Sequence, residues 1–328
     1  MKLRDSSSSI SPELAGSWQR FRGHRRYGDR IFSNLTFVLA LSIVAILLGL
    51  VVILILDALP AITKFGISFL TSSTWDPVRE IFGALPSIYG TLLTSIIGLL
   101  IAVPISLGAA IFLVELAPSW LRGPASFLIE MLAAVPSVII GLWGLFVLVP
   151  AIKPVEVWLS ANVGFIPIFN GTVLGGLSFF TAGIILSFMV IPIITAVSRD
   201  AIKAVPDTQR EAMLAVGATR WETISRVVIP YCRSSLVGAV MLGLGRALGE
   251  TMAVTMVIGN ADKLTAFLFS PGTTIASKIA SNFSEASSGA FTGSLVELAL
   301  ILFAVTLLVN VVARVLVWRM TSVKAEKE

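Results

Sequence analysis

Six long apolar stretches divide this chain, and they leave it few folds other than a bundle of membrane-spanning helices. The stretches cover Ile31–Leu56, Pro86–Val114, Pro124–Ile152, Gly171–Ser198, Ser234–Ala261 and Ala290–Ala313. A helix needs about 20 apolar residues to cross a bilayer, and each stretch is long enough. Only 13% of the 328 residues are charged, against about 25% in soluble domains. The sequence therefore predicts an all-α integral membrane protein with six transmembrane helices.

The positions of lysine and arginine predict how these helices are oriented. Most of the 24 basic residues lie before the first stretch, between the fourth and fifth, and after the sixth. Cytoplasmic loops of membrane proteins carry an excess of such residues. We therefore expect both termini and the loop between stretches four and five in the cytoplasm. Residues 1–30 would form a basic cytoplasmic tail, and residues 31–328 a six-span transmembrane domain.

The tail interleaves aromatic residues with arginines. Trp18, Phe21 and Tyr27 alternate with basic side chains close to the first span. Such a pattern is compatible with nucleic acid, but beside a membrane span it favours lipid phosphates and headgroups. We expect membrane lipid, and not nucleic acid, as its partner.

The scarcity of reactive residues excludes most catalytic chemistry. The chain has one cysteine, Cys232, and one histidine, His24, so an internal disulfide and a Cys/His zinc site are both impossible. The nucleotide-binding pattern GxxxxGK[ST] is absent. We therefore expect no enzyme activity, no metal and no cofactor in this chain.

The loop between the fourth and fifth stretches is predicted to contain two short helices. Thr208-x-x-Glu211 fits a capping box at the start of the first helix. Gly217 can end that helix in the left-handed conformation. Thr219-x-x-Glu222 is a second capping box.

The same loop resembles the EAA motif of ABC importer permeases. That motif reads Glu-Ala-Ala, three residues, Gly, nine residues, Ile, one residue, Leu-Pro. The matching residues here are Glu211, Ala212, Met213, Gly217, Val227, Ile229 and Pro230. Every spacing fits, and the three departures from the pattern are all apolar. Pro230 is also expected to stop the second helix of the loop.

This resemblance implies a coupling loop over residues 199–232 that docks on a separate ATPase subunit. The small side chain of Ala212 would let the ATPase subunit approach the helix closely. Gly217 would set the angle between the two short helices of the loop. Glu211 would cap the helix or meet a basic residue of the ATPase. Pro230 belongs to the same coupling motif.

Two further segments narrow the resemblance to phosphate ABC transporter permeases of the PstC type. They run from Glu130 to Gly141 and from Gly245 to Val254, where Gly-Glu-Thr-Met-Ala-Val is typical of that subunit. The resemblance implies the MetI-like permease fold, with its core over residues 85–317. It also implies a PstA-type permease partner, PstB-type ATPases, a periplasmic phosphate-binding protein and a bacterial inner membrane.

Three charged residues within the apolar stretches are candidates for the substrate pathway. Arg246 lies about 18 Å and Glu250 about 24 Å into the fifth stretch, which places Arg246 close to the middle of a membrane core of about 30 Å. At i,i+4 they could pair and merely fix helix packing; alternatively, Arg246 meets phosphate with its planar donors. Glu130, in the third stretch, could lie at the interface or in the pathway.

Small-residue spacings predict close helix packing in two places. They are Gly171-x-x-x-Gly175 and Gly245-x-x-x-Gly249, whose lack of side chains lets backbones approach.

Three alternatives to a phosphate importer remain open at this point. The chain could serve another oxyanion importer, act as a secondary transporter or channel that uses its buried charges without ATP, or be a membrane scaffold. The EAA-like loop favours the importer over a secondary transporter or channel, which has no use for it. A scaffold would leave Arg246 and Glu250 in the bilayer without a purpose.

Overall fold

The structure is a computed structural model that describes residues 12–286 and 289–325, with side chains described over 27–286 and 289–315. The chain divides into two compact units, Met1–Leu56 and Asp57–Glu328. Apart from one isolated β-bridge between Asp76 and Ile81, the described residues form helices and loops. The α-helices are α1 Pro12–Phe65, α2 Ser68–Thr71, α3 Leu85–Ile111, α4 Ser119–Ala133, α5 Ser137–Trp143, α6 Val149–Val163, α7 Phe179–Lys203, α8 Asp207–Ala215, α9 Arg220–Thr223, α10 Ile229–Gly249, α11 Met252–Val257, α12 Ile275–Asn282 and α13 Gly289–Ala325. Short π-helical turns occupy η1 Phe112–Leu116, η2 Gly144–Leu148 and η4 Ile224–Val228, and 3₁₀ turns occupy η3 Pro167–Phe169 and η5 Phe283–Glu285.

The described residues of the first unit, 12–56, all belong to one long helix. α1 begins at Pro12 and contains no further proline until Pro60, so nothing interrupts its hydrogen bonds where the apolar stretch begins. Its part from Tyr27 to Phe65 is long and apolar enough to cross a membrane. The predicted tail is therefore not separate from the helix, although residues 1–11 lie outside the described part of the chain.

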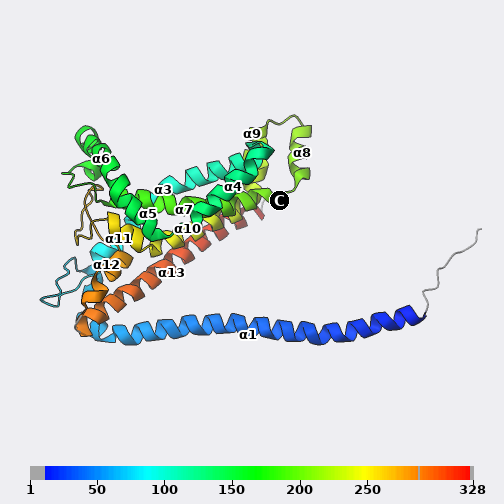
Figure 1. The fold of residues 1–328 in the computed structure, drawn as a ribbon, viewed down its shortest axis with the longest axis horizontal. Coiled ribbons are helices and arrows are strands. Elements are labelled where there is room, and N and C mark those ends of the chain that lie inside the picture. Colours follow the sequence, from blue (N-terminus) through cyan, green and yellow to red (C-terminus); the bar gives the residue numbers. More distant parts are fainter. Residues whose placement is uncertain (1–11, 287–288, 326–328) are drawn as a thin grey trace, which may run out of the picture. The chain divides into compact units, whose positions relative to one another are not determined.

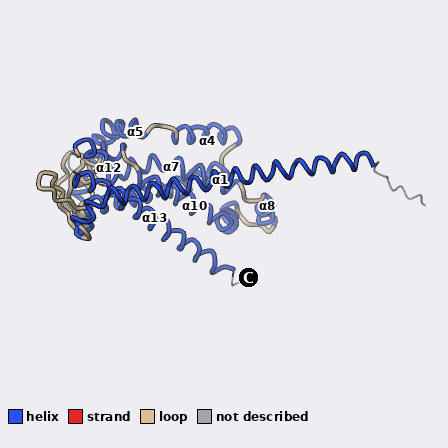
Figure 2. Tube along the Cα trace, turned by 90° about the horizontal axis from the view of Figure 1, so that it is seen from below, coloured by secondary structure: helices blue, strands red, loops and turns tan. Residues whose placement is uncertain are grey.

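The second unit is built around α7, which packs along both α3 and α10 (Figures 1 and 2). Its core includes Phe179, Ile185 and Ile194, all fully buried. α3 and α7 approach closely, since a Cβ atom at Gly98 would lie 3.0 Å from the Cβ of Leu186. α8 lies at one end of α7 and α12 at the other.

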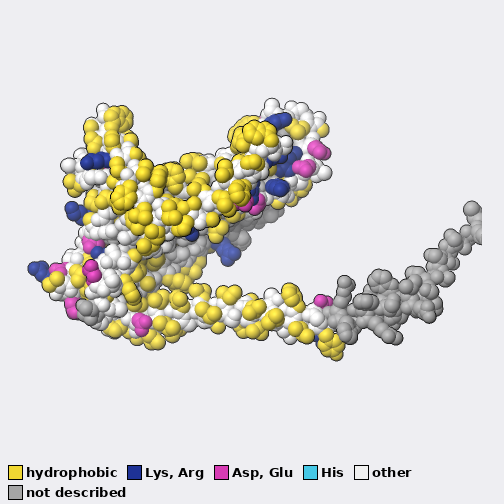
Figure 3. Space-filling view, in the orientation of Figure 1, with side chains coloured by type: hydrophobic (Ala, Val, Ile, Leu, Met, Phe, Trp, Pro, Cys, Tyr) yellow, Lys and Arg dark blue, Asp and Glu magenta, His cyan; other side chains and the backbone are white. Residues whose placement is uncertain are grey.

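Six helices in the described part of the chain are long and apolar enough to span a membrane. They confirm the predicted number of spans. Figure 3 shows hydrophobic side chains along the flanks of the second unit, with charged side chains gathered near α8 and α9 and at the opposite end. This distribution suits helices whose middles lie in lipid and whose ends reach water.

The third apolar stretch does not form one helix from Pro124 to Ile152. α4 ends at Ala133, and Pro136 adopts an extended conformation before α5 begins. Proline lacks an amide donor and disfavours a helical residue before it, which explains the break. The segment long enough to span a membrane is instead Ser137–Val163.

The fourth helix starts later than the sequence predicts. Residues 171–178 form a loop in which Gly175 and Gly176 have φ values of 104° and 87°. α7 begins only after Ser178, whose hydroxyl accepts a hydrogen bond from the amide of Thr181. The prediction that Gly171-x-x-x-Gly175 packs two helices was wrong, because these glycines serve a loop.

The fifth helix starts earlier and ends earlier than predicted. A continuous helical segment runs from Arg220 to Gly249 through α9, η4 and α10. Pro230 does not stop it but lies in the first turn of α10. Its missing amide is tolerated there because a π-helical turn directly precedes it and shifts the hydrogen-bond pattern.

Candidate functional site

The short helix α8 carries the EAA-like motif. It begins at Asp207, directly after Pro206, whose backbone is extended and whose side chain makes no capping bond. The predicted capping box at Thr208 was therefore wrong, because the fixed φ of Pro206 sets the start of the helix two residues earlier. Glu211 consequently lies in the second turn and cannot cap the helix.

The elbow after α8 is formed as the sequence predicts. Gly217 has a φ of 87°, a conformation that strains residues with a Cβ atom. The amide of Gly217 donates to Leu214 O at 3.0 Å and that of Ala218 to Met213 O at 3.1 Å. These two bonds form a Schellman motif, which closes the helix and turns the chain.

The predicted capping box of the next helix is also confirmed. The amide of Glu222 donates to the Thr219 hydroxyl at 3.2 Å, and the Glu222 carboxylate accepts from the Thr219 amide at 2.9 Å. The two bonds satisfy donors that would otherwise be unpaired at the start of a helix. Hydrogen bonds therefore fix the backbone on both sides of the elbow, at the end of α8 and at the start of α9.

Three large apolar side chains are exposed among charged and polar ones on this helix pair. Glu211 and Ala212 are exposed. Leu214, Val216 and Trp221 expose 48%, 79% and 68% of their surface. Exposed apolar groups rimmed by polar ones mark protein interaction sites.

Arg210 attaches α8 to the spans, a role that the sequence did not reveal. Its side chain is 15% exposed and bonds Glu115 of η1 at 3.1 Å and Asp207 at 3.0 Å. It also donates to the carbonyl oxygens of Ile202, at 2.8 Å, and Val205. One guanidinium thus connects α8 with the ends of both α3 and α7. The only sign of this contact in the sequence is the acidic residue Glu115 just after the second stretch. It lies 95 positions from Arg210, so the sequence does not indicate that the two pair.

Arg246 lies on an open face of α10. Its side chain is exposed and borders a hollow of about 610 Å³ between α10, α7 and α13. The described residues that line this hollow include no acidic side chain. The guanidinium is therefore available to an anion.

Glu250 does not share a helical face with Arg246. α10 ends at Gly249, and Glu250 is extended, with 8% of its surface exposed. Its carboxylate accepts a bond from the amide of Ala253 at 3.4 Å, at the start of α11. The i,i+4 geometry expected for an Arg246–Glu250 pair is absent, because the fifth span breaks between α10 and α11.

Glu130 is paired elsewhere. It accepts a hydrogen bond from Arg199 on α7 at 3.0 Å, and Arg199 also contacts Asp200 at 2.9 Å. The structure therefore places Glu130 in a charge cluster between α4 and α7, and not beside the hollow that Arg246 lines.

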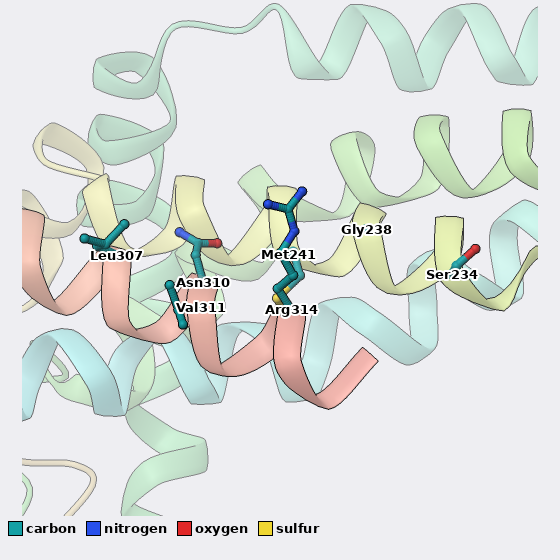
Figure 4. Close-up of a pocket in the computed structure, with 7 residues that line it drawn as sticks. All are labelled: Ser234, Gly238, Met241, Leu307, Asn310, Val311 and Arg314. Atoms are coloured by element: carbon teal, nitrogen blue, oxygen red, sulfur yellow. The ribbon is translucent and has the colours of Figure 1, made fainter. Parts of the chain in front are cut away.

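A second hollow of about 550 Å³ continues between α10 and α13 (Figure 4). Asn310 and Arg314 project into it from α13, and Ser234 borders it from α10. Arg314 is exposed, and no ion pair is recorded for it within the described residues. The sequence analysis did not identify Asn310 or Arg314 as site residues. Their i,i+4 spacing, which places them on one face of the last helix, was the available signal.

The glycines of α10 face two different environments. A Cβ atom at Gly243 would lie 2.7 Å from Val190 of α7, so this glycine permits close packing inside the chain. Gly238, Gly245 and Gly249 have no atom within 4 Å of such a position. The predicted packing through Gly245-x-x-x-Gly249 therefore involves no helix among the described residues of this chain.

Comparison with known proteins gives a consistent result. Residues 102–322 match the family described as binding-protein-dependent transport system inner membrane component. The phosphate transport system permease protein PstC of Haemophilus influenzae is 46% identical over 91% of this chain and 96% of its own length. PstC of Mesorhizobium japonicum is 46% identical over 89% of this chain and 90% of the relative. PstC 2 of Mycobacterium tuberculosis is 42% identical over 88% and 91%.

Two solved structures share the fold. A chain of a bacterial alginate ABC transporter, solved with an alginate-bound periplasmic protein, has a TM-score of 0.61 at 16% identity and covers 90% of this chain and 98% of its own. A chain of the inward-facing methionine transporter MetNI has a TM-score of 0.54 at 15% identity, covering 75% and 99%. Both likenesses concern the fold alone.

Proposed function

The chain belongs to the binding-protein-dependent transport system inner membrane components and, within them, to the PstC permeases; from this premise we propose that it is a permease subunit of an ATP-driven importer of inorganic phosphate. The observation that carries the proposal is 46% identity to PstC over 91% of the chain. The fixed, exposed coupling helix α8 supports it, because a channel or a secondary transporter has no use for such a helix.

We infer three kinds of partner for this subunit. The exposed apolar residues around α8 suit a docking groove on a PstB-type ATPase, which would supply the ATP hydrolysis. Gly249, which lines neither hollow and has no atom within 4 Å of a Cβ position, suits contact with a helix of a PstA-type permease, because small residues allow close approach in lipid. A periplasmic phosphate-binding protein would deliver the anion to the opposite end.

The distribution of basic residues supports the orientation of the subunit in a bacterial inner membrane. The segment from Arg199 to Arg233, which contains α8, is rich in arginine. On the positive-inside rule we place this segment and both termini in the cytoplasm.

We propose that Arg246 meets phosphate within the membrane. A charge at this depth costs several kcal/mol unless it is paired or hydrated, and an anion in the hollow would provide the pair. Its planar fork of donors matches the oxygens of phosphate. Glu250 lines neither hollow, so we propose that it meets the anion at another point of its passage. There it would contribute selectivity, because phosphate near neutral pH carries a proton that a carboxylate can accept, whereas sulfate carries none. We assign Glu130 a supporting role through Arg199.

The proposal is tested on the subunit co-purified with its partners and reconstituted in vesicles. We expect phosphate-dependent ATPase activity and phosphate uptake, and we expect Arg246→Gln to abolish uptake while assembly and ATP binding survive. Arg233→Gln is the matched control, because Arg233 lies on the same helix outside both hollows. Normal uptake by Arg246→Gln would remove Arg246 from the pathway. Uptake of sulfate but not phosphate by the unchanged protein would contradict the assigned substrate.

A further inference from the structure

The two hollows between α10 and α13 form one continuous groove. Gly238, Met241 and Asn310 border both of them. From Ser234 at one end to Arg246 at the other, the groove follows α10 over about 18 Å, at about 1.5 Å per residue. It therefore connects the depth of Arg246 with the end of the bundle that carries α8.

The polar groups of this groove are mainly donors. Arg246 and Arg314 contribute guanidinium groups, which have no acceptor. Asn310 donates one amide hydrogen to Thr306 O at 2.9 Å, which leaves the other hydrogen free for a ligand. None of the described residues lining either hollow is acidic. The two guanidinium groups therefore attract anions to two places along an otherwise mostly apolar groove.

We propose that Arg314 and Asn310 form a second oxyanion subsite, which receives the anion from Arg246 and releases it on the α8 side. The inference rests on the proposed function and assigns two further residues to that pathway. Passage through a membrane needs binding strong enough for entry and weak enough for exit, and several successive sites meet both needs better than one. The ligand is a tetrahedral oxyanion, whose oxygens suit the arginine fork and the asparagine amide together.

Two other roles for Arg314 predict different results. As a topological signal near the end of a span, it would act by charge alone, so lysine would replace it fully. As a contact for a second permease, its loss would prevent assembly. The subsite instead requires the planar N–H donors of the guanidinium, which lysine lacks. Arg314→Lys should therefore transport phosphate faster than Arg314→Gln but more slowly than the unchanged protein.

The test uses the complete complex in vesicles, with inorganic phosphate as the probe. We expect Arg314→Gln to assemble normally and to retain phosphate-stimulated ATPase activity, but to reduce the maximal uptake rate about tenfold or more, since a hydrogen-bonded charge is lost. Asn310→Ala should reduce the rate in the same direction by a smaller factor. Arg314→Lys should fall between Arg314→Gln and the unchanged protein, and Arg233→Gln should match the unchanged protein.

The outcomes separate this inference from the proposed function. If the unchanged complex imports no phosphate, the proposed function fails. If it imports phosphate and Arg314→Gln imports equally fast, only the subsite is overturned. Full activity of Arg314→Lys, or failure of Arg314→Gln to assemble, also overturns the subsite.

Discussion

At the residue scale, Arg210 has the most consequential set of contacts in the coupling segment. Its guanidinium bonds carboxylates of η1 and α8 and carbonyl oxygens at the end of α7. Arg210 and Glu115 are each only 15% exposed. In the proposed complex, force applied to α8 by the ATPase would therefore pass directly to two spans.

We predict that Arg210→Gln uncouples ATP hydrolysis from uptake. Removing one member of a largely buried pair costs about 3 kcal/mol and leaves Glu115 without its partner. The measurement is the number of phosphate ions imported per ATP hydrolysed, which should fall several-fold while the complex still assembles. Arg210→Lys, which keeps the positive charge but cannot reach all these acceptors at once, should retain part of this ratio. An unchanged ratio in Arg210→Gln would show that the contact only supports the fold.

At the element scale, the elbow between α8 and α9 depends on one backbone conformation. A Cβ atom at Gly217 would meet nothing within 4 Å, so the requirement for glycine comes from its φ of 87° and not from crowding.

We predict that Gly217→Val weakens coupling by bending the elbow differently. A β-branched residue in the left-handed region costs about 1–2 kcal/mol. Phosphate-stimulated ATPase activity should fall while insertion into the membrane is normal. Gly217→Asn is the matched control, because asparagine tolerates this conformation, and it should keep most of the activity. Equal activity of the valine and asparagine variants would refute the role of the elbow.

The packing of α3 gives a second test on this scale. A Cβ atom at Gly90 would lie 1.9 Å from the carbonyl oxygen of Thr273, whereas one at Gly108, in the same helix, would meet nothing within 4 Å. We predict that Gly90→Ala lowers the melting temperature by several degrees, because an overpacked core costs about 1–3 kcal/mol. Gly108→Ala should leave it unchanged or raise it, since alanine favours helix by about 1 kcal/mol. A thermal-shift assay in detergent compares the two, and equal melting temperatures would contradict the packing.

The elements also show how far sequence reasoning reached and where it stopped. Hydrophobic length identified all six spans, and local rules identified Gly217 and the Thr219 cap, because those features depend on neighbours in the chain. The break at Glu250 was missed because it lies inside an apolar stretch, where composition cannot distinguish one helix from two. The Arg210–Glu115 contact and the groove between α10 and α13 depend on tertiary packing, so no local pattern predicted them.

At the scale of the whole molecule, the orientation of the spans decides whether α8 can reach an ATPase at all. The basic residues around it lead us to predict that a reporter fused after Pro206 or Lys324 is cytoplasmic. A reporter fused after Pro77 or Ser270 should be periplasmic. Alkaline phosphatase and green fluorescent protein fusions at the same four positions check each other, because each is active on one side only. A periplasmic result at Pro206 would remove the coupling proposal altogether.

The open face of α10 has a consequence for how cells must produce this protein. A subunit made without a neighbour would leave Gly238, Gly245 and Gly249 against lipid and Arg246 unpaired there, at a cost of several kcal/mol. Orphan copies should therefore be short-lived substrates for membrane proteases. The cellular level of the transporter would then depend on matched synthesis of this subunit and its proposed permease partner, as from one shared messenger RNA. The rate at which either gene alone is translated would matter less.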